Sequence, residues 1–149
     1  MRIGIIADTH GLLRPEAVAA LAGVERILHA GDVGSSDVLV ALERIAPVDA
    51  VRGNVDYGPW ADALPLRKDV TLGGVRFHLA HIREDARPGD ADVVVFGHSH
   101  QPLIEGVDGV LWFNPGSAGP RRFKLPICLG LLEIEGGEAR GRLVDLQVP

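Results

Sequence analysis

The chain opens with Arg2-Ile-Gly-Ile-Ile-Ala-Asp-Thr-His10, a short apolar run that ends in an acid and a histidine. The run is too short for a signal peptide or a membrane span, and its length predicts a buried β-strand. Two more apolar runs follow at 26–30 and 48–51, and helical patterns that open at Pro15 and near Ser36 separate the three. This βαβαβ order predicts a parallel sheet with right-handed crossover connections.

The second half of the chain is rich in predicted strands. Turn residues separate strand candidates at 70–72, 74–80, 93–96 and 110–113, and a closing hairpin is expected from 127–134 and 139–146. Residues 57–66 contain two prolines and are expected to form a loop. We therefore expect an α/β fold of two stacked mixed sheets flanked by helices.

Length and composition limit the classes of function. A chain of 149 residues predicts one domain over 1–149, and 46% apolar residues are enough for a hydrophobic core. The net charge of −5 argues against stable binding of duplex nucleic acid or of a membrane surface. The only cysteine is Cys128, which excludes an internal disulfide and a cysteine-rich zinc site. These properties predict a cytoplasmic protein.

Side chains that can bind a metal follow five of the apolar runs. They are Asp8, His10, Asp32, Asn54, His81, His98 and His100. The carboxyl ends of neighbouring strands converge in open α/β sheets, so these groups are expected to meet in one crevice. Seven ligands are too many for one tetrahedral ion, but they suit two ions that share a bridging carboxylate. Nitrogen and oxygen ligands without thiolate favour Mn²⁺, Fe²⁺, Zn²⁺, Co²⁺ or Ni²⁺ over Ca²⁺ or Mg²⁺.

The two remaining histidines have a different setting. His29 and His78 lie inside strand runs, where a buried and hydrogen-bonded side chain is the expected state.

The residues at the strand ends resemble the motifs of the calcineurin-like metallophosphoesterases. The resemblance spans the chain from residue 3 to about residue 122, and it is strongest to the small single-domain phosphodiesterases of bacteria and archaea. Its motifs are Asp8-Thr-His10, Gly31-Asp32, Gly53-Asn-Val-Asp56, His81, Gly97-His-Ser-His100 and Asn114-Pro-Gly-Ser117. It implies a four-layer α/β/β/α sandwich with two metals between the sheets.

The resemblance also implies roles for single residues. Carried over by position, one metal is held by Asp8, His10, Asp32 and His100, and the other by Asp32, Asn54, His81 and His98. Asp32 is then the bridging ligand, and Asp32, Asn54 and His10 are the residues expected to serve catalysis. The implied cofactors are two divalent ions per chain, with Mn²⁺ as the first candidate. The implied activity is a phosphodiesterase in which a metal-bridging hydroxide attacks the phosphorus of a small phosphoester.

Two positions depart from the resembling family. Val55 stands where other branches carry a histidine that is thought to protonate the leaving group. The chain reads His81-Ile-Arg83 where the family commonly has His-Gly-His, and Arg83 is interpreted either as a phosphate contact or as a solvated charge. The basic segment Arg121-Arg122-Phe-Lys124 is similarly either a solvated loop or a contact for an anionic substrate.

Two other functions compete with a phosphoesterase. The resembling retromer scaffold subunit has the same fold with few metal ligands, so a protein-interaction scaffold is the main alternative. All seven ligand positions are occupied by competent residues here, which favours the enzyme. A nuclease like the larger DNA-repair members is disfavoured, because 149 residues leave no room for a DNA-clamping domain. The sequence is compatible with a monomer and with a homo-oligomer.

Overall fold

The computed structural model describes residues 1–149, and its strands form two five-stranded sheets. The first sheet has the strand order β10-β9-β1-β2-β3. Its strands are β1 (Arg2–Ile6), β2 (Arg26–His29), β3 (Val48–Ala50), β9 (Cys128–Glu135) and β10 (Glu138–Asp145). Strands β1, β2 and β3 are parallel, and the hairpin β9–β10 continues the sheet in antiparallel register beyond β1.

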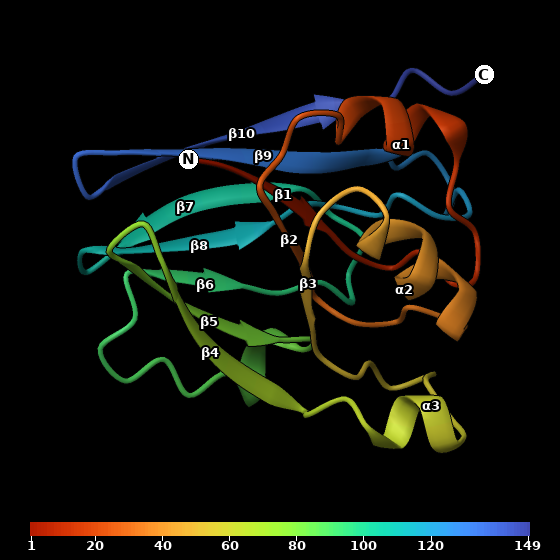
Figure 1. Ribbon diagram of the computed structural model, residues 1–149, viewed down its shortest axis with the longest axis horizontal. Helices are drawn as coiled ribbons and strands as arrows, with labels where there is room; N and C mark the ends of the chain where they lie inside the picture. The colour runs from red at the N-terminus through yellow and green to blue at the C-terminus, as the bar shows by residue number, and fades with distance from the viewer.

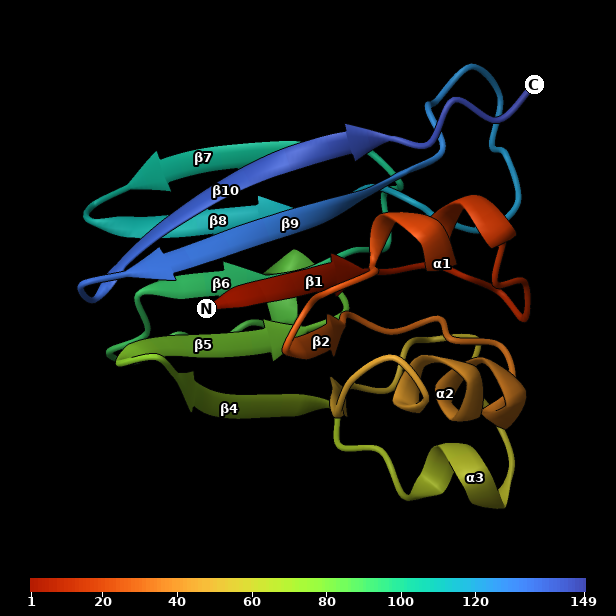
Figure 2. The same ribbon diagram turned by 45° about the horizontal axis from the view of Figure 1, so that its top comes forward.

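The second sheet has the strand order β4-β5-β6-β8-β7. Its strands are β4 (Arg67–Leu72), β5 (Val75–Ala80), β6 (Val93–Val95), β7 (Leu103–Val107) and β8 (Val110–Asn114). The central strands β5, β6 and β8 are parallel, and antiparallel β4 and β7 form the two edges. Figure 2 shows the two sheets stacked face to face. The predicted class, an α/β sandwich of two mixed sheets, is confirmed.

The helices are few and short: α1 (Pro15–Ala20), α2 (Ser36–Glu43) and α3 (Pro59–Asp62). Helices α1 and α2 cover the outer face of the first sheet, where Leu21 and Leu42 pack with Ile6 and Ile27. The outer face of the second sheet is covered by a single 3₁₀ turn, residues 83–85, and by the loop that follows it. The layer on that side is therefore thinner than a row of α-helices.

The space between the sheets is filled by the alternate side chains of both. Ile3 and Ile5 of the first sheet pack with Phe77 and Phe113 of the second, and all four are buried. The ring of Phe113 lies over Gly130, where a Cβ atom would overlap the ring. The glycine thus allows an aromatic side chain to reach the backbone of the opposite sheet.

Two elements differ from the sequence-based expectation. Residues 59–62 of the expected loop form the short helix α3, because Pro59 at its first position suits a helix start. Strand β7 was not predicted, because Glu105 and Gly106 interrupt its apolar pattern. The strand forms because its backbone pairs with β8, and its own residues do not have the apolar pattern of a strand. No helix is both long and apolar enough to cross a bilayer.

Candidate metal centre

The loops that follow β1, β2, β3, β5 and β6 carry the seven candidate ligands. The arrowheads of β1, β5 and β6 point to the same side of the molecule (Figure 1), so these loops share one end of the sandwich. The first sheet supplies Asp8, His10, Asp32 and Asn54, and the second supplies His81, His98 and His100. Because the two sheets are stacked, both sets of loops meet at this end.

One group of possible ligands consists of Asp8, His10 and His100. The Oδ1 atom of Asp8 lies 3.8 Å from Nε2 of His10 and 3.5 Å from Nε2 of His100. The two histidine Nε2 atoms are 3.4 Å apart. Three ligand atoms therefore surround one small space, which is what a single cation requires.

A second group consists of Asp32, His81 and His98. Oδ2 of Asp32 lies 3.1 Å from Nε2 of His81. The amide oxygen of Asn54 lies 3.2 Å from Nδ1 of His98, which brings this fourth candidate to the same place. The structure thus brings together all seven residues that the sequence indicated.

Asp32 lies between the two groups. Its Oδ2 atom is 3.1 Å from His81 in the second group and 3.7 Å from Nε2 of His10 in the first. Its Oδ1 atom accepts a hydrogen bond from the backbone N–H of Val55, which fixes the carboxylate plane. Asp8 Oδ1 is also 3.8 Å from Nε2 of His81, so the groups adjoin.

Several buried polar atoms at the centre have no hydrogen-bond partner. They are Oδ1 of Asp8, Nε2 of His81 and Nδ1 of His100, and only Arg26 Nε shares this state elsewhere in the chain. An unsatisfied buried polar group costs about 1–3 kcal/mol, so Asp8 Oδ1 and His81 Nε2, which both belong to the ligand groups, indicate a missing partner. His81 Nδ1 lies 2.8 Å from the carbonyl oxygen of Ala30, to which its N–H donates. This tautomer leaves Nε2 free as a ligand atom, and the donor set fits a divalent cation.

Opposite charges perturb the pKa values of the second group. Burial alone would lower the pKa of His81, but the close approach of the Asp32 carboxylate and the charge of Asp8 raise it above the ordinary value. Burial would likewise raise the pKa of Asp32, but the contacts with His81 lower it below the ordinary value. The carboxylates therefore favour positive charge beside them.

The backbone at the candidate ligands is strained. Asp8, His10, Asp32, His98 and His100 all have φ angles between 48° and 71°, in the left-handed region. Only three other non-glycine residues of the chain have positive φ. Such conformations are uncommon for residues with a side chain, and they cluster at functional sites, where the surrounding structure enforces them.

Asp56 holds two of the ligand loops together. Its buried carboxylate accepts hydrogen bonds from the backbone N–H groups of Val33, Gly34 and Gly53, at 2.8–3.2 Å. The first two donors follow Asp32, and the third precedes Asn54. Asp56 therefore fixes the loop of one candidate ligand against the loop of another. In the sequence, Asp56 was identified only as the last residue of the motif Gly53-Asn-Val-Asp56, and this function was not predicted.

Asn114, the last residue of β8, and Ser117, three residues further on, support the remaining loops. The amide of Asn114 donates to the carbonyl oxygen of Gly97, next to His98, at 3.2 Å. The hydroxyl of Ser117 donates to the carbonyl oxygen of Asp8 at 3.0 Å. These two residues follow the ligand motifs in the sequence, and in the fold their side chains hydrogen-bond to the backbone of the ligand loops.

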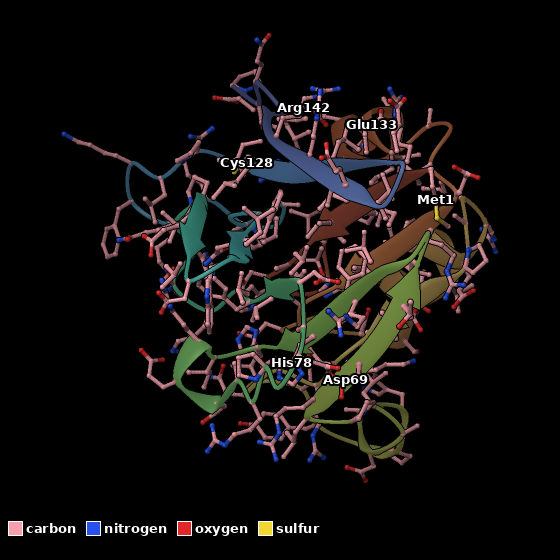
Figure 3. All side chains as sticks on the ribbon, turned by 90° about the vertical axis from the view of Figure 1, so that its left-hand side faces the viewer. Met1, Asp69, His78, Cys128, Glu133 and Arg142 are labelled. Carbon is pink, nitrogen blue, oxygen red and sulfur yellow. The ribbon has the colours of Figure 1, made fainter.

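His29 and His78 are buried and hydrogen-bonded, as predicted. His29 Nδ1 accepts from the N–H of Gly31, and its Nε2 lies 3.0 Å from the hydroxyl of Thr9. Complete burial lowers the pKa of His29 to about 3. His78 lies beside Asp69 (Figure 3), with Nδ1 2.7 Å from its Oδ1. Neither histidine reaches the centre.

Two residues that depart from the family pattern lie at the rim. The Arg83 guanidinium stacks 4.8 Å from the centre of the Trp112 ring and pairs with Glu105 at 3.4 Å. The side chain of Val55 is exposed. Arg83 thus has protein partners on the surface of the second sheet.

Two stacked sheets whose loops bring acids and histidines together at one end form a candidate metal site of the kind that metal-dependent hydrolases use. The family model of the calcineurin-like phosphoesterase superfamily domain matches residues 1–137. A probable metallophosphoesterase of Methanothermobacter thermautotrophicus is 36% identical over 168 aligned residues, covering 100% of this chain and 95% of the relative. The chain belongs to the calcineurin-like phosphoesterase superfamily. The prediction of a metal-dependent phosphoester hydrolase is confirmed at the level of the family.

Solved structures agree with this placement. A structure described as a novel archaeal phosphodiesterase has a TM-score of 0.76 and 28% identity, covering 97% of this chain and all of the other. Vps29 of Entamoeba histolytica in complex with Zn²⁺ has a TM-score of 0.74 at 21% identity, covering 99% and 100%. The second likeness shows the shared fold.

Proposed function

We propose that this protein is a dinuclear metal phosphodiesterase. One ion is held by Asp8, His10, Asp32 and His100, and the other by Asp32, Asn54, His81 and His98. The observation that carries the proposal is the pair of ligand groups that adjoin at Asp32. The unpartnered buried atoms Oδ1 of Asp8 and Nε2 of His81 support it, because bound cations would satisfy them. The donor set suits Mn²⁺, with Fe²⁺, Zn²⁺, Co²⁺ and Ni²⁺ as alternatives.

When bound, two such ions supply a hydroxide nucleophile near neutral pH and neutralise the oxygens of the phosphoryl group. The chain itself offers no activated serine. Ser117 is buried and donates its hydroxyl proton to the backbone at Asp8. Ser99 Oγ accepts hydrogen bonds from Asn114 and from the N–H of Gln101, and no base contacts it. We assign Asp32, Asn54 and His10 to ligation and to orientation of the substrate phosphate.

The leaving group receives little help from the chain. The side chain of Val55 has no acidic proton, and both carboxylate oxygens of Asp56 already accept backbone N–H groups. A positioned general acid typically contributes 10²–10⁴-fold to the rate, mostly for basic leaving groups. The enzyme is therefore best suited to small diesters whose leaving group is already acidic.

A protein-interaction scaffold on the same fold is the competing function. The Vps29 structures support it through fold alone, at 20–22% identity. The complete ligand set of this chain favours the enzyme, as does the similarity to an archaeal phosphodiesterase. We propose a single catalytic domain over residues 1–149, active on small phosphoesters in the cytoplasm.

Metal content and activity of one variant test the proposal. Asp32→Asn removes the charge of the shared ligand, and we expect it to lose both ions and roughly 10³-fold in kcat against bis(p-nitrophenyl) phosphate. Asn54→Ala should lose only the second ion. Asp37→Asn, an exposed acid on α2, is the matched control and should keep both ions and full activity.

The measurements are elemental analysis of each purified protein and hydrolysis rates in Mn²⁺ before and after chelation. A wild-type protein that binds less than one ion per chain and hydrolyses no phosphoester in any divalent ion would overturn the proposal. Unchanged metal content in Asp32→Asn would show that the shared ligand is another residue.

A further inference from the structure

A cavity of about 420 Å³, shallow and largely open to solvent, lies beside the first ligand group. Its lining consists of His10, His100, Pro120, Arg121, Arg122 and Phe123. Two of these are candidate metal ligands, and the other four are consecutive residues of the loop between β8 and β9. A molecule whose phosphate lies at the ligand groups can therefore extend into this space.

Phe123 is unusually exposed for an apolar side chain. It is 89% exposed, more than any other large hydrophobic residue of the chain, and it contributes to none of the hydrophobic clusters. Its φ angle of 52° places it in the left-handed region, which is a strained conformation for an aromatic residue. A strained and exposed aromatic residue at the edge of a cavity points to a function in binding rather than in stability.

The charge of the cavity is positive in an acidic protein. No acid lines it, although the chain carries a net charge of −5. Arg121 donates to the carbonyl oxygen of Val148 and is held by the C-terminal segment. The backbone carbonyl of Arg122 accepts the N–H of Leu125, but its side chain makes no hydrogen bond or ion pair, so the guanidinium is free to bind an anion. The cavity thus combines an exposed aromatic ring with an unpaired cation.

We propose that this cavity is a subsite for a nucleoside, so that the substrates are phosphodiesters with a nucleoside on one arm. The proposal rests on the proposed phosphodiesterase function. The base stacks on Phe123, and Arg122 contacts the phosphate between the nucleoside and the metal ligands. A volume of about 420 Å³ is within the range of pockets for small ligands, and stacking accepts any base, because every base has a π-face.

Two diesters with the same leaving group test the subsite. One is the p-nitrophenyl ester of thymidine 5′-phosphate, and the other is methyl p-nitrophenyl phosphate. Both release p-nitrophenolate, so a difference in kcat/KM reports the group on the other arm. We expect wild type to prefer the thymidine diester by about tenfold or more, which is the range of one base–aromatic stack.

Variants of the loop assign the preference to its residues. Phe123→Ala should lower kcat/KM for the thymidine diester about tenfold more than for the methyl diester, and Phe123→Tyr should retain the preference. Val40→Ala, an exposed apolar side chain on α2, is the matched control and should leave both rates unchanged. Competitive inhibition by thymidine 5′-phosphate should weaken in parallel in Phe123→Ala and in Arg122→Ala.

The outcomes separate the two proposals. Turnover of both diesters without preference would overturn the nucleoside subsite and leave the phosphodiesterase intact, whereas no turnover of either would remove the phosphodiesterase itself. An equal loss on both diesters in Phe123→Ala would show that the residue only shapes the loop. A wild-type dimer in light scattering that Phe123→Ala dissociates would show that a second copy covers the ring, and this would also overturn the subsite.

Discussion

The stability of the metal-free protein should depend on pH through His29. Complete burial lowers the pKa of His29 to about 3, against 6.5 for the free side chain. Between these two values the unfolded chain takes up a proton at this residue and the folded chain does not. Stability from the neutral histidine is therefore fully present above pH 6.5 and is lost as the pH falls toward 3.

The size of the effect follows from the width of this window. One pKa unit corresponds to about 1.4 kcal/mol, so acidification by two pH units below 6.5 should lower the free energy of unfolding by about 2.7 kcal/mol. Domains are typically stable by about 5–15 kcal/mol, so this one residue accounts for a large share of acid sensitivity.

The assay is urea denaturation in a chelating buffer, followed by circular dichroism, at several pH values between 7 and 4.5. His29→Gln has no proton to take up, so the pH slope of wild type should exceed that of the variant by about 1.4 kcal/mol per unit. Thr9→Val removes the hydroxyl partner of His29 but keeps the titrating group. It should lower stability at every pH and leave the slope unchanged. Equal slopes in wild type and His29→Gln would refute the reasoning.

Three further changes have defined outcomes. Asp56→Asn removes the negative charge of the carboxylate that accepts three backbone N–H groups. It should lower the free energy of unfolding by about 1–3 kcal/mol and weaken metal binding measured by calorimetry. Unchanged metal affinity would contradict the proposal that Asp56 holds the ligand loops together. In a series of aryl phosphodiesters, log kcat/KM of wild type should fall steeply as the pKa of the leaving group rises. Val55→His should make this dependence shallower, because the imidazole supplies a general acid. A flat dependence in wild type would mean that another group already protonates the leaving oxygen. Gly130→Ala places a methyl group against the Phe113 ring and should cost about 1–3 kcal/mol in thermal or urea unfolding. Phe113→Leu in the same chain should recover part of that cost, and fully additive losses would argue against the contact.

The sequence was most informative where apolar runs end in polar residues. The run before Asp8 and the run before His98 are strands, and both lead into the centre as expected. A strand that is buried in the fold is a short, uninterrupted run of apolar residues in the sequence, so such strands can be recognised before the structure is known. Strand β7 escaped prediction because its order comes from pairing with β8 rather than from its own residues.

The assembly of the candidate centre could be predicted only in part. The order of the motifs indicated which residues would converge, but the backbone contacts of Asp56 depend on three N–H groups brought together by the fold. The cavity at Phe123 was equally hidden, because exposure and a left-handed φ angle are properties of a three-dimensional loop. The sequence of the basic segment is compatible with a solvated loop or with an anion contact, and only the structure shows it beside His10 and His100.

The left-handed backbone conformation at five candidate ligands lowers the stability of the fold at the residues that metal binding requires. Each such residue other than glycine costs roughly 1–2 kcal/mol, so the five together cost about as much as the net stability of a small domain. Glycine at His10, His98 or His100 would relieve the strain and abolish ligation. In a lineage released from selection for hydrolysis, substitution by glycine at these positions would stabilise the fold while it removed the metal ligands. The route from enzyme to inert scaffold is energetically downhill, and only continued selection for catalysis keeps the strained residues in place.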